Sequence, residues 1–253
     1  MKKEFVTLFL ILSVSFAFRL LTYRENQSGA PPYGLSEEDV PKFGSIEWSR
    51  EWVRPNVPAK VAIQAGHYMN DELPSELERL RDNDGSAGGG KHEWEVNLAI
   101  SEEIKSILNE NGIEAEILPA TIPPRYWADV FIAIHADGSE NTSKRGFKIA
   151  KPWRDFSGKA DRLISFLRDE YQEETGFSWD DNITQNMRGY YAFSWWKFEH
   201  AIHPMTTAVI FETGFLTNYY DRQIIVNQPD IAAQAIAKGV MRYLESEGLV
   251  ISD

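Results

Sequence analysis

Three apolar segments of the sequence each end in a residue that could bind a metal or move a proton. They are Gln64-Ala65-Gly66-His67, Ile132-Ala133-Ile134-His135 and Val209-Ile210-Phe211-Glu212. A single histidine at a strand end is more often a hydrogen-bonded structural residue, but three such ends on one sheet are hard to assign to chance. Because ligands of α/β sheets gather where strands end and loops begin, these residues predict a functional site at one edge.

A carboxylate at the start of the first long helix, Glu93, could supply a third metal ligand. Neutral imidazoles and one carboxylate suit zinc and leave a fourth position for water. Bound zinc lowers the pKa of that water towards about 7 and polarises a substrate carbonyl. Glu212 could then take the proton of the water and pass it to a leaving amine. Taken alone, these residues leave a zinc hydrolase and a set of structural histidines both open.

The segments that must position these residues alternate between short apolar runs and stretches with helical periodicity. This alternation predicts an α/β fold, a single domain whose mixed, mostly parallel twisted sheet is flanked by helices. The expected strands are 61–63, 113–118, 130–134, 146–150 and 207–211, and the expected helices are 93–109, 157–171 and 231–244.

Composition removes several alternatives. The 253 residues include no cysteine, which excludes disulfides, thiolate zinc sites, iron–sulfur clusters and cysteine nucleophiles. Any metal must therefore be held by His, Asp or Glu. With 26 basic and 38 acidic residues, the formal charge is −12, and the chain lacks the basic footprint of a nucleic-acid-binding protein.

The first residues are typical of an export segment. Lys2 and Lys3 precede an apolar run of about 14 residues, shorter than the roughly 20 that a membrane-spanning helix needs. Ser15 and Ala17 fit a cleavage site after Ala17. We expect residues 1–21 to be a secretory signal peptide or an uncleaved N-terminal membrane anchor.

Either alternative places the remainder in the periplasm, outside the cell or in the cell envelope. Without residues 1–21 the chain keeps 23 basic and 37 acidic residues, a formal −14. Residues 22–58 are rich in proline and predict a linker, with a short amphipathic piece around Trp48 and Trp52. The catalytic domain is expected over residues 59–248.

Four ordered motifs give the chain a family resemblance. They are Ala65-Gly66-His67, Glu93-Trp94-Glu95-Val96-Asn97-Leu98-Ala99-Ile100, Phe131-Ile132-Ala133-Ile134-His135-Ala136 and Glu212-Thr213-Gly214-Phe215-Leu216-Thr217-Asn218. In this order they resemble the motifs of the zinc-dependent N-acetylmuramoyl-L-alanine amidases, bacterial cell-wall hydrolases. The resemblance covers about residues 60–245. It implies that His67, Glu93 and His135 bind Zn²⁺, that Glu212 is the catalytic carboxylate, and that peptidoglycan is the substrate.

The sequence departs from that family pattern at the rim of the expected site. Gln64 stands where the family usually has an aspartate, and residues 68–71 replace a glycine-rich loop. The stretch between the second and third strands shrinks to residues 119–125. These changes bear on substrate preference. Two alternatives therefore stay open: a zinc peptidase or amidase for another peptide-like substrate, and a catalytically silent peptidoglycan-binding module.

Other conspicuous residues have simpler interpretations. The segment 85–91 resembles a phosphate-binding loop, but His92 stands where that motif needs Ser or Thr. We expect a flexible loop there, a solvated Glu95, and structural or rim roles for His200 and His203. The aromatic residues of 190–198 are expected to pack in the core, with a substrate groove as the alternative; they are Tyr190, Tyr191, Trp195, Trp196 and Phe198.

Overall fold

The computed structural model describes residues 42–250. The expected export segment 1–21 and residues 22–41 of the expected linker lie outside this range. The chain divides into two units between Trp52 and Val53, and each is described by itself. In the first unit, α2 (Ile46–Glu51) is capped by the Ser45 hydroxyl, which accepts from the amide of Trp48. Among the described residues, no helix combines the length and apolarity needed to span a membrane.

The second unit is built on a five-stranded sheet in the order β4-β1-β5-β7-β6. The four strands β4, β1, β5 and β7 run parallel, and β6 is antiparallel to β7. Because both faces are covered, the central strands are apolar along most of their length. The strand bounds are β1 (Lys60–Ala65), β4 (Glu114–Leu118), β5 (Val130–Asp137), β6 (Lys148–Ala150) and β7 (Thr207–Phe215).

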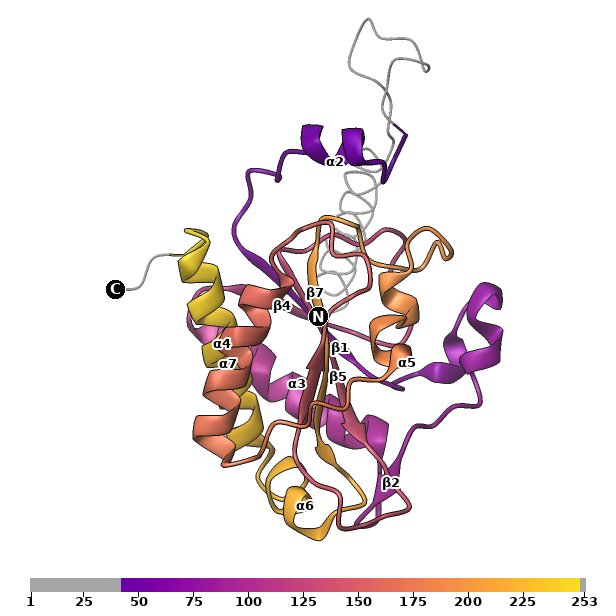
Figure 1. Cartoon of the computed structure of the whole chain (residues 1–253), viewed down its shortest axis with the longest axis vertical. Helices are drawn as coiled ribbons and strands as arrows, with labels where there is room; N and C mark the ends of the chain where they lie inside the picture. Colours follow the sequence, from indigo (N-terminus) through magenta and orange to yellow (C-terminus); the bar gives the residue numbers. More distant parts are fainter. Residues whose placement is uncertain (1–41, 251–253) are drawn as a thin grey trace, which may run out of the picture. The chain divides into compact units, whose positions relative to one another are not determined.

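Three long helices cover one face of this sheet, as Figure 1 shows: α3 (Glu93–Glu110), α4 (Ala160–Thr175) and α7 (Pro229–Ser246). The apolar stripe of α3 is buried against the strands through Val96, Ile100 and Ile104. Shorter elements and irregular chain cover the opposite face, among them η2 (Ser75–Leu80), α5 (Gln185–Arg188) and η3 (Tyr191–Phe193). The predicted α/β class, with a mixed and mostly parallel sheet, is confirmed.

Two strands run further than the sequence indicated. We expected them to end before His135 and Glu212, but β5 continues to Asp137 and β7 to Phe215. Both residues therefore lie inside strands. The reason is that β7 is paired on both sides, with β5 and with β6, and these ladders hold the backbone extended past the last apolar run.

Helix α4 starts three residues later than expected and ends later. The Asp155 carboxylate accepts from the amides of Gly158 and Ala160, and Gly158 has a φ of +66°. This turn occupies the positions predicted as the first helical residues. The helix ends at Thr175, where left-handed Gly176 terminates it. The remaining elements are η1 (Asn70–Glu72), β2 (Ala87–Gly88), β3 (Lys91–His92) and α6 (Tyr219–Ile225).

Candidate metal centre and catalytic carboxylate

The structure brings together the three residues predicted as metal ligands. Glu93 Oε1 lies 3.5 Å from His67 Nε2 and 2.9 Å from His135 Nδ1. One ligand atom from each residue lies within 4.8 Å of the others. They come from the turn after β1, the first residue of α3 and the interior of β5. Two imidazoles and one carboxylate form a donor set that suits zinc.

Glu93 is buried and held in its ionised form. Its carboxylate accepts from the amides of Ser86 (2.6 Å) and Ala136 (3.2 Å) and from the Asn97 side chain (3.3 Å). Burial by itself raises the pKa of Glu93, but the hydrogen bond and charge of His135, with smaller effects of His67 and Ser86, lower it to about 2. The N-terminus of α3 adds a favourable dipole. The carboxylate is therefore ready to act as an anionic ligand.

His67 lies in the turn after β1 with a φ of +62°, in the left-handed region. Its Nδ1 lies 2.5 Å from the carbonyl oxygen of Asn83. Because a carbonyl can only accept, Nδ1 carries the hydrogen and the lone pair of Nε2 faces Glu93. Burial, and next the charge of His135, lower the pKa of His67. Its imidazole is therefore held neutral, which is the form that coordinates a metal.

Two glycines leave the space that this cluster fills. A Cβ on Gly66 would lie 2.4 Å from His135 Cε1. A Cβ on Gly85, whose φ is +73°, would lie 2.2 Å from Glu93 Oε2 and 2.8 Å from His67 Cδ2. Neither position can carry a larger residue without moving a ligand. The backbone is thus shaped around the imidazoles and the carboxylate.

Glu212 lies beside the cluster on the next strand. It is the register partner of His135 across β5 and β7, and of Lys148 across β7 and β6. Burial, together with the negative charges of Glu93 and Asp137, raises the pKa of Glu212 to about 8, although His135 and Lys148 oppose the rise. A carboxyl group with such a pKa can both take up and release a proton near neutral pH.

The other conspicuous residues lie outside the cluster. Glu95 accepts from the amide of His92 and pairs with Lys91 at 2.9 Å. His200 bonds to Glu76. The glycine-rich segment forms the β2–β3 hairpin before α3, not the strand-to-helix loop of a phosphate site.

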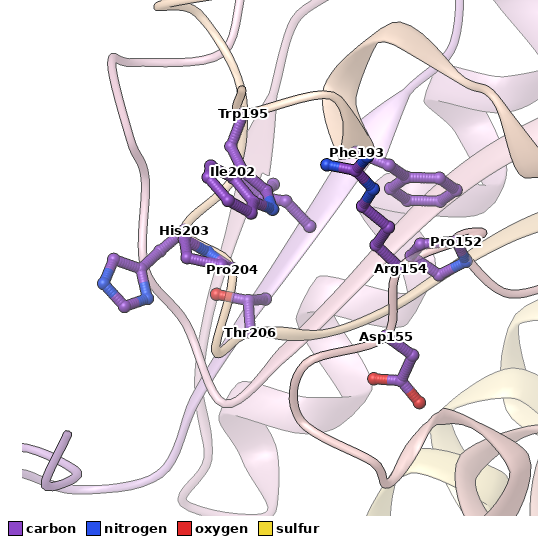
Figure 2. Close-up of a pocket in the computed structure, with 9 residues that line it drawn as sticks. All are labelled: Pro152, Arg154, Asp155, Phe193, Trp195, Ile202, His203, Pro204 and Thr206. Atoms are coloured by element: carbon purple, nitrogen blue, oxygen red, sulfur yellow. The ribbon is translucent and has the colours of Figure 1, made fainter. Parts of the chain in front are cut away.

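A pocket separate from the cluster is lined by Arg154, Trp195, His203 and Thr206, among others (Figure 2). Thr206 directly precedes β7, so this pocket lies at the end of that strand opposite to Glu212. Burial, followed by the charge of Arg125, lowers the pKa of His203 to about 4. A neutral histidine is consistent with the structural or rim role expected for it.

One contact to the cluster was missed in the sequence. The Tyr190 hydroxyl lies 3.1 Å from His135 Nε2 and donates to Gln64 Oε1 at 2.9 Å. Of the aromatic residues 190–198, Tyr191 and Phe198 are buried as expected, whereas Trp196 is 44% exposed. No spacing or periodicity in the sequence links Gln64 to Tyr190.

Comparison with known protein families identifies the family of this chain. A family model described as N-acetylmuramoyl-L-alanine amidase matches residues 61–242. The chain belongs to this amidase family. The matched range contains His67, Glu93, His135 and Glu212. The chain is therefore an enzyme of the class that cleaves N-acetylmuramoyl-L-alanine amides in peptidoglycan, as the resemblance implied. No curated protein matches the chain.

Solved structures of such amidases share the fold. The catalytic domain of CwlV from Bacillus (Paenibacillus) polymyxa var. colistinus is 21% identical, with a TM-score of 0.50 over 74% of this chain and 98% of that one. An amidase from Clostridium difficile 630 is 19% identical, with a TM-score of 0.53 over 76% and 99%. Ami1 from Mycobacterium abscessus is 18% identical, with a TM-score of 0.53 over 74% and 100%.

Proposed function

We propose that this amidase is zinc-dependent and hydrolyses the amide bond between N-acetylmuramic acid and L-alanine in peptidoglycan. In this proposal His67, Glu93 and His135 bind zinc, and Glu212 is the catalytic carboxylate. The observation that carries it is the convergence of two imidazole nitrogens on one ionised carboxylate oxygen, 2.9 and 3.5 Å away. The register partner of His135, Glu212, lies next to that cluster.

The donor set fits zinc in chemistry and in spacing. Zinc in hydrolases is held by three protein ligands of this kind, with a fourth position open to water or substrate. A zinc ion held there would supply Lewis acidity, which polarises an amide carbonyl and makes water more acidic. His67 and Glu93 are both held in the protonation states that coordination needs, neutral and ionised respectively.

Glu212 moves the proton in this mechanism. Its carboxylate accepts a proton from the attacking water, and the resulting carboxylic acid donates that proton to the nitrogen of the departing L-alanine. A pKa near 8 leaves a minor fraction of Glu212 ionised, and so able to act as the base, at neutral pH. The positive charge of a cation held by His67, Glu93 and His135 would lower that pKa and increase the ionised fraction of Glu212.

Digestion of purified peptidoglycan tests this proposal. The full chain should release free lactyl groups of muramic acid and intact stem peptides, identified by mass spectrometry. A chelator should abolish the release and added zinc should restore it. Cleavage at another peptide bond would instead indicate a zinc peptidase, and binding to sacculi without any product would indicate a silent module. Activity that survives complete metal removal would contradict the zinc mechanism.

We also propose that the chain is exported, with its catalytic domain in the cell envelope or outside the cell. The support is the sequence of residues 1–21, with its lysine pair and short apolar run. Cell fractionation followed by N-terminal sequencing tests this. A mature chain beginning near residue 18 would identify a cleaved signal peptide. An intact N-terminus in the membrane fraction would identify an anchor, and an intact chain in the cytoplasm would contradict export.

A further inference from the structure

A chain of hydrogen bonds leads from the cluster into the opposite face of the sheet. His135 Nε2 lies 3.1 Å from the Tyr190 hydroxyl, which donates to Gln64 Oε1 at 2.9 Å. The ring of Tyr190 meets the imidazole edge-on, with 5.3 Å between centroids. Gln64 is fully buried in β1. Neither Tyr190 nor Gln64 is among the residues that converge on Glu93.

The direction of these hydrogen bonds is fixed by the far end of the chain. Gln64 Nε2 lies 3.2 Å from the carbonyl oxygen of Ala120 and 3.3 Å from that of Pro119. Carbonyl oxygens can only accept, so the amide nitrogen must point towards them and Oε1 must point towards Tyr190. Tyr191 supports this arrangement, because its hydroxyl accepts from Gln64 Nε2 at 2.8 Å.

The same reasoning assigns the hydrogen on His135. The single hydroxyl hydrogen of Tyr190 is donated to Gln64 Oε1, so its oxygen faces His135 Nε2 as an acceptor. His135 Nε2 must then carry a hydrogen. Without a metal, Nδ1 also donates a hydrogen to the ionised Glu93 carboxylate, 2.9 Å away. When that hydrogen is lost, Nδ1 is the nitrogen left with a lone pair for a metal. This matches His67, whose Nδ1 hydrogen is held by the carbonyl of Asn83. Each imidazole is thus held by its outer nitrogen, so that the inner one can coordinate.

We propose that Tyr190 and Gln64 are positioning residues that hold His135 in the tautomer and orientation needed to bind the metal. This inference rests on the proposed function. Gln64 donates through its amide nitrogen to the carbonyls of Pro119 and Ala120, while its amide oxygen accepts from Tyr190. The glutamine and the tyrosine therefore work as a pair in this chain. Outer partners of this kind set metal affinity by orienting the ligand and making it more basic.

Zinc affinity of the variant Tyr190→Phe tests the inference. The change removes one hydroxyl and keeps the ring, and we expect zinc to bind about 10- to 100-fold more weakly, measured by competition with a chromophoric chelator. The matched control is Tyr243→Phe, which removes a buried hydroxyl that bonds to Thr207 at the first residue of β7. The control should bind zinc as the unmodified chain does.

Nitrogen-15 NMR of the imidazoles measures the Nε2 hydrogen of His135 directly. A purely structural role of Tyr190 would leave this signal unchanged. The chain has only five histidines, so the Nε2 hydrogen of His135 can be assigned in the zinc-bound protein. It should be protected from exchange with water in the unmodified chain and in Tyr243→Phe, and exchange faster in Tyr190→Phe. Zinc affinity within about twofold of the unmodified chain, or an unchanged exchange rate, would each overturn the inference.

A second variant tests the inference independently if Tyr190→Phe folds poorly. Gln64→Met keeps the length of the side chain and removes its amide, and it should weaken zinc binding by a similar factor. Because both residues act through one hydrogen-bond chain, the double variant should be no weaker than the stronger single one; additive losses would contradict a shared pathway. Peptidoglycan digestion by the unmodified chain is measured separately. If zinc binds but nothing is cleaved, the proposed function fails while the affinities still decide this inference.

Discussion

Replacing Gly66 by alanine perturbs the cluster through one atom. The added Cβ would lie 2.4, 2.5 and 2.7 Å from Cε1, Nε2 and Nδ1 of the His135 ring. Non-bonded carbon atoms rest about 3.5–4.0 Å apart, so the ring must withdraw by roughly 1 Å. A metal site tolerates only about 0.2 Å of error in a ligand distance. The displacement is several times larger than coordination by Nδ1 allows.

We therefore expect Gly66→Ala to weaken zinc binding by on the order of 100-fold, and peptidoglycan cleavage by at least as much, since a misplacement of about 1 Å commonly costs that factor. Chelator competition measures the first effect, and mass spectrometry of released peptides measures the second. Gly90→Ala is the control. A Cβ at Gly90 meets nothing within 4 Å, but its φ is +77°, so this variant should lose stability and keep its zinc.

The result that refutes this reasoning is a Gly66→Ala variant that folds, binds zinc with unchanged affinity and cleaves at the normal rate. It would mean that His135 does not occupy the position described here when the metal is bound. A loss of both properties in Gly90→Ala as well would show that the effect comes from general destabilisation. The two variants together therefore distinguish the effect of displacing His135 from the effect of destabilising the fold.

Four further outcomes follow from the same geometry. Glu212→Gln should retain zinc while turnover falls by about 10²- to 10⁴-fold, measured by product release and metal analysis; normal turnover would exclude its proton-transfer role. Zinc at about 100 times its Kd should stabilise the fold by about 2.7 kcal/mol, seen as a rise in Tm; an unchanged Tm would argue against a folded-state site. The pKa of Glu212, raised to about 8, means that the folded state binds more protons than the unfolded one between about pH 4.5 and 8. Metal-free protein should therefore lose stability as the pH rises from about 4.5 to 8, by at most about 5 kcal/mol at 1.36 kcal/mol per tenfold change in proton affinity. The variant Glu212→Gln should lack this loss in denaturant titrations. Arg54→Ala should cost about 1.5–3 kcal/mol in denaturant titration, because Arg54 donates to buried Asp129 at 2.6 Å; an unchanged midpoint would show that this contact adds nothing.

The meeting of His67, Glu93 and His135 could be predicted from the sequence because each residue is tied to a local pattern. Short apolar runs located the strands, and the start of a helical period located Glu93. Parallel strands then place their carboxyl ends together, so His67 and His135 had to converge. The exact strand ends were wrong because pairing on both sides, as for β7, extends a strand beyond the apolar run that reveals it.

The contact between Tyr190 and Gln64 could not be predicted in this way. It joins residues 126 positions apart, and Tyr190 lies in irregular chain between α5 and η3. No period or spacing fixes where such a side chain points. Its direction depends on the packing of the second sheet face, where Tyr190 and Tyr191 lie with ring centroids 4.6 Å apart. The sequence showed a cluster of aromatic residues, but only the fold distinguishes Tyr190, which contacts His135, from those that pack elsewhere.

The two carboxylates of the site differ in their surroundings, and that difference supports the roles proposed for them. Glu93 receives two backbone amides, the Asn97 side chain and a helix N-terminus, so it stays ionised and suits a ligand. The carboxyl group of Glu212 has no comparable set of donors among the described residues, and burial together with the charge of Glu93 raises its proton affinity. Where two acids have very different pKa values, the acid with the lower pKa stays charged, and the acid with the higher pKa can transfer protons.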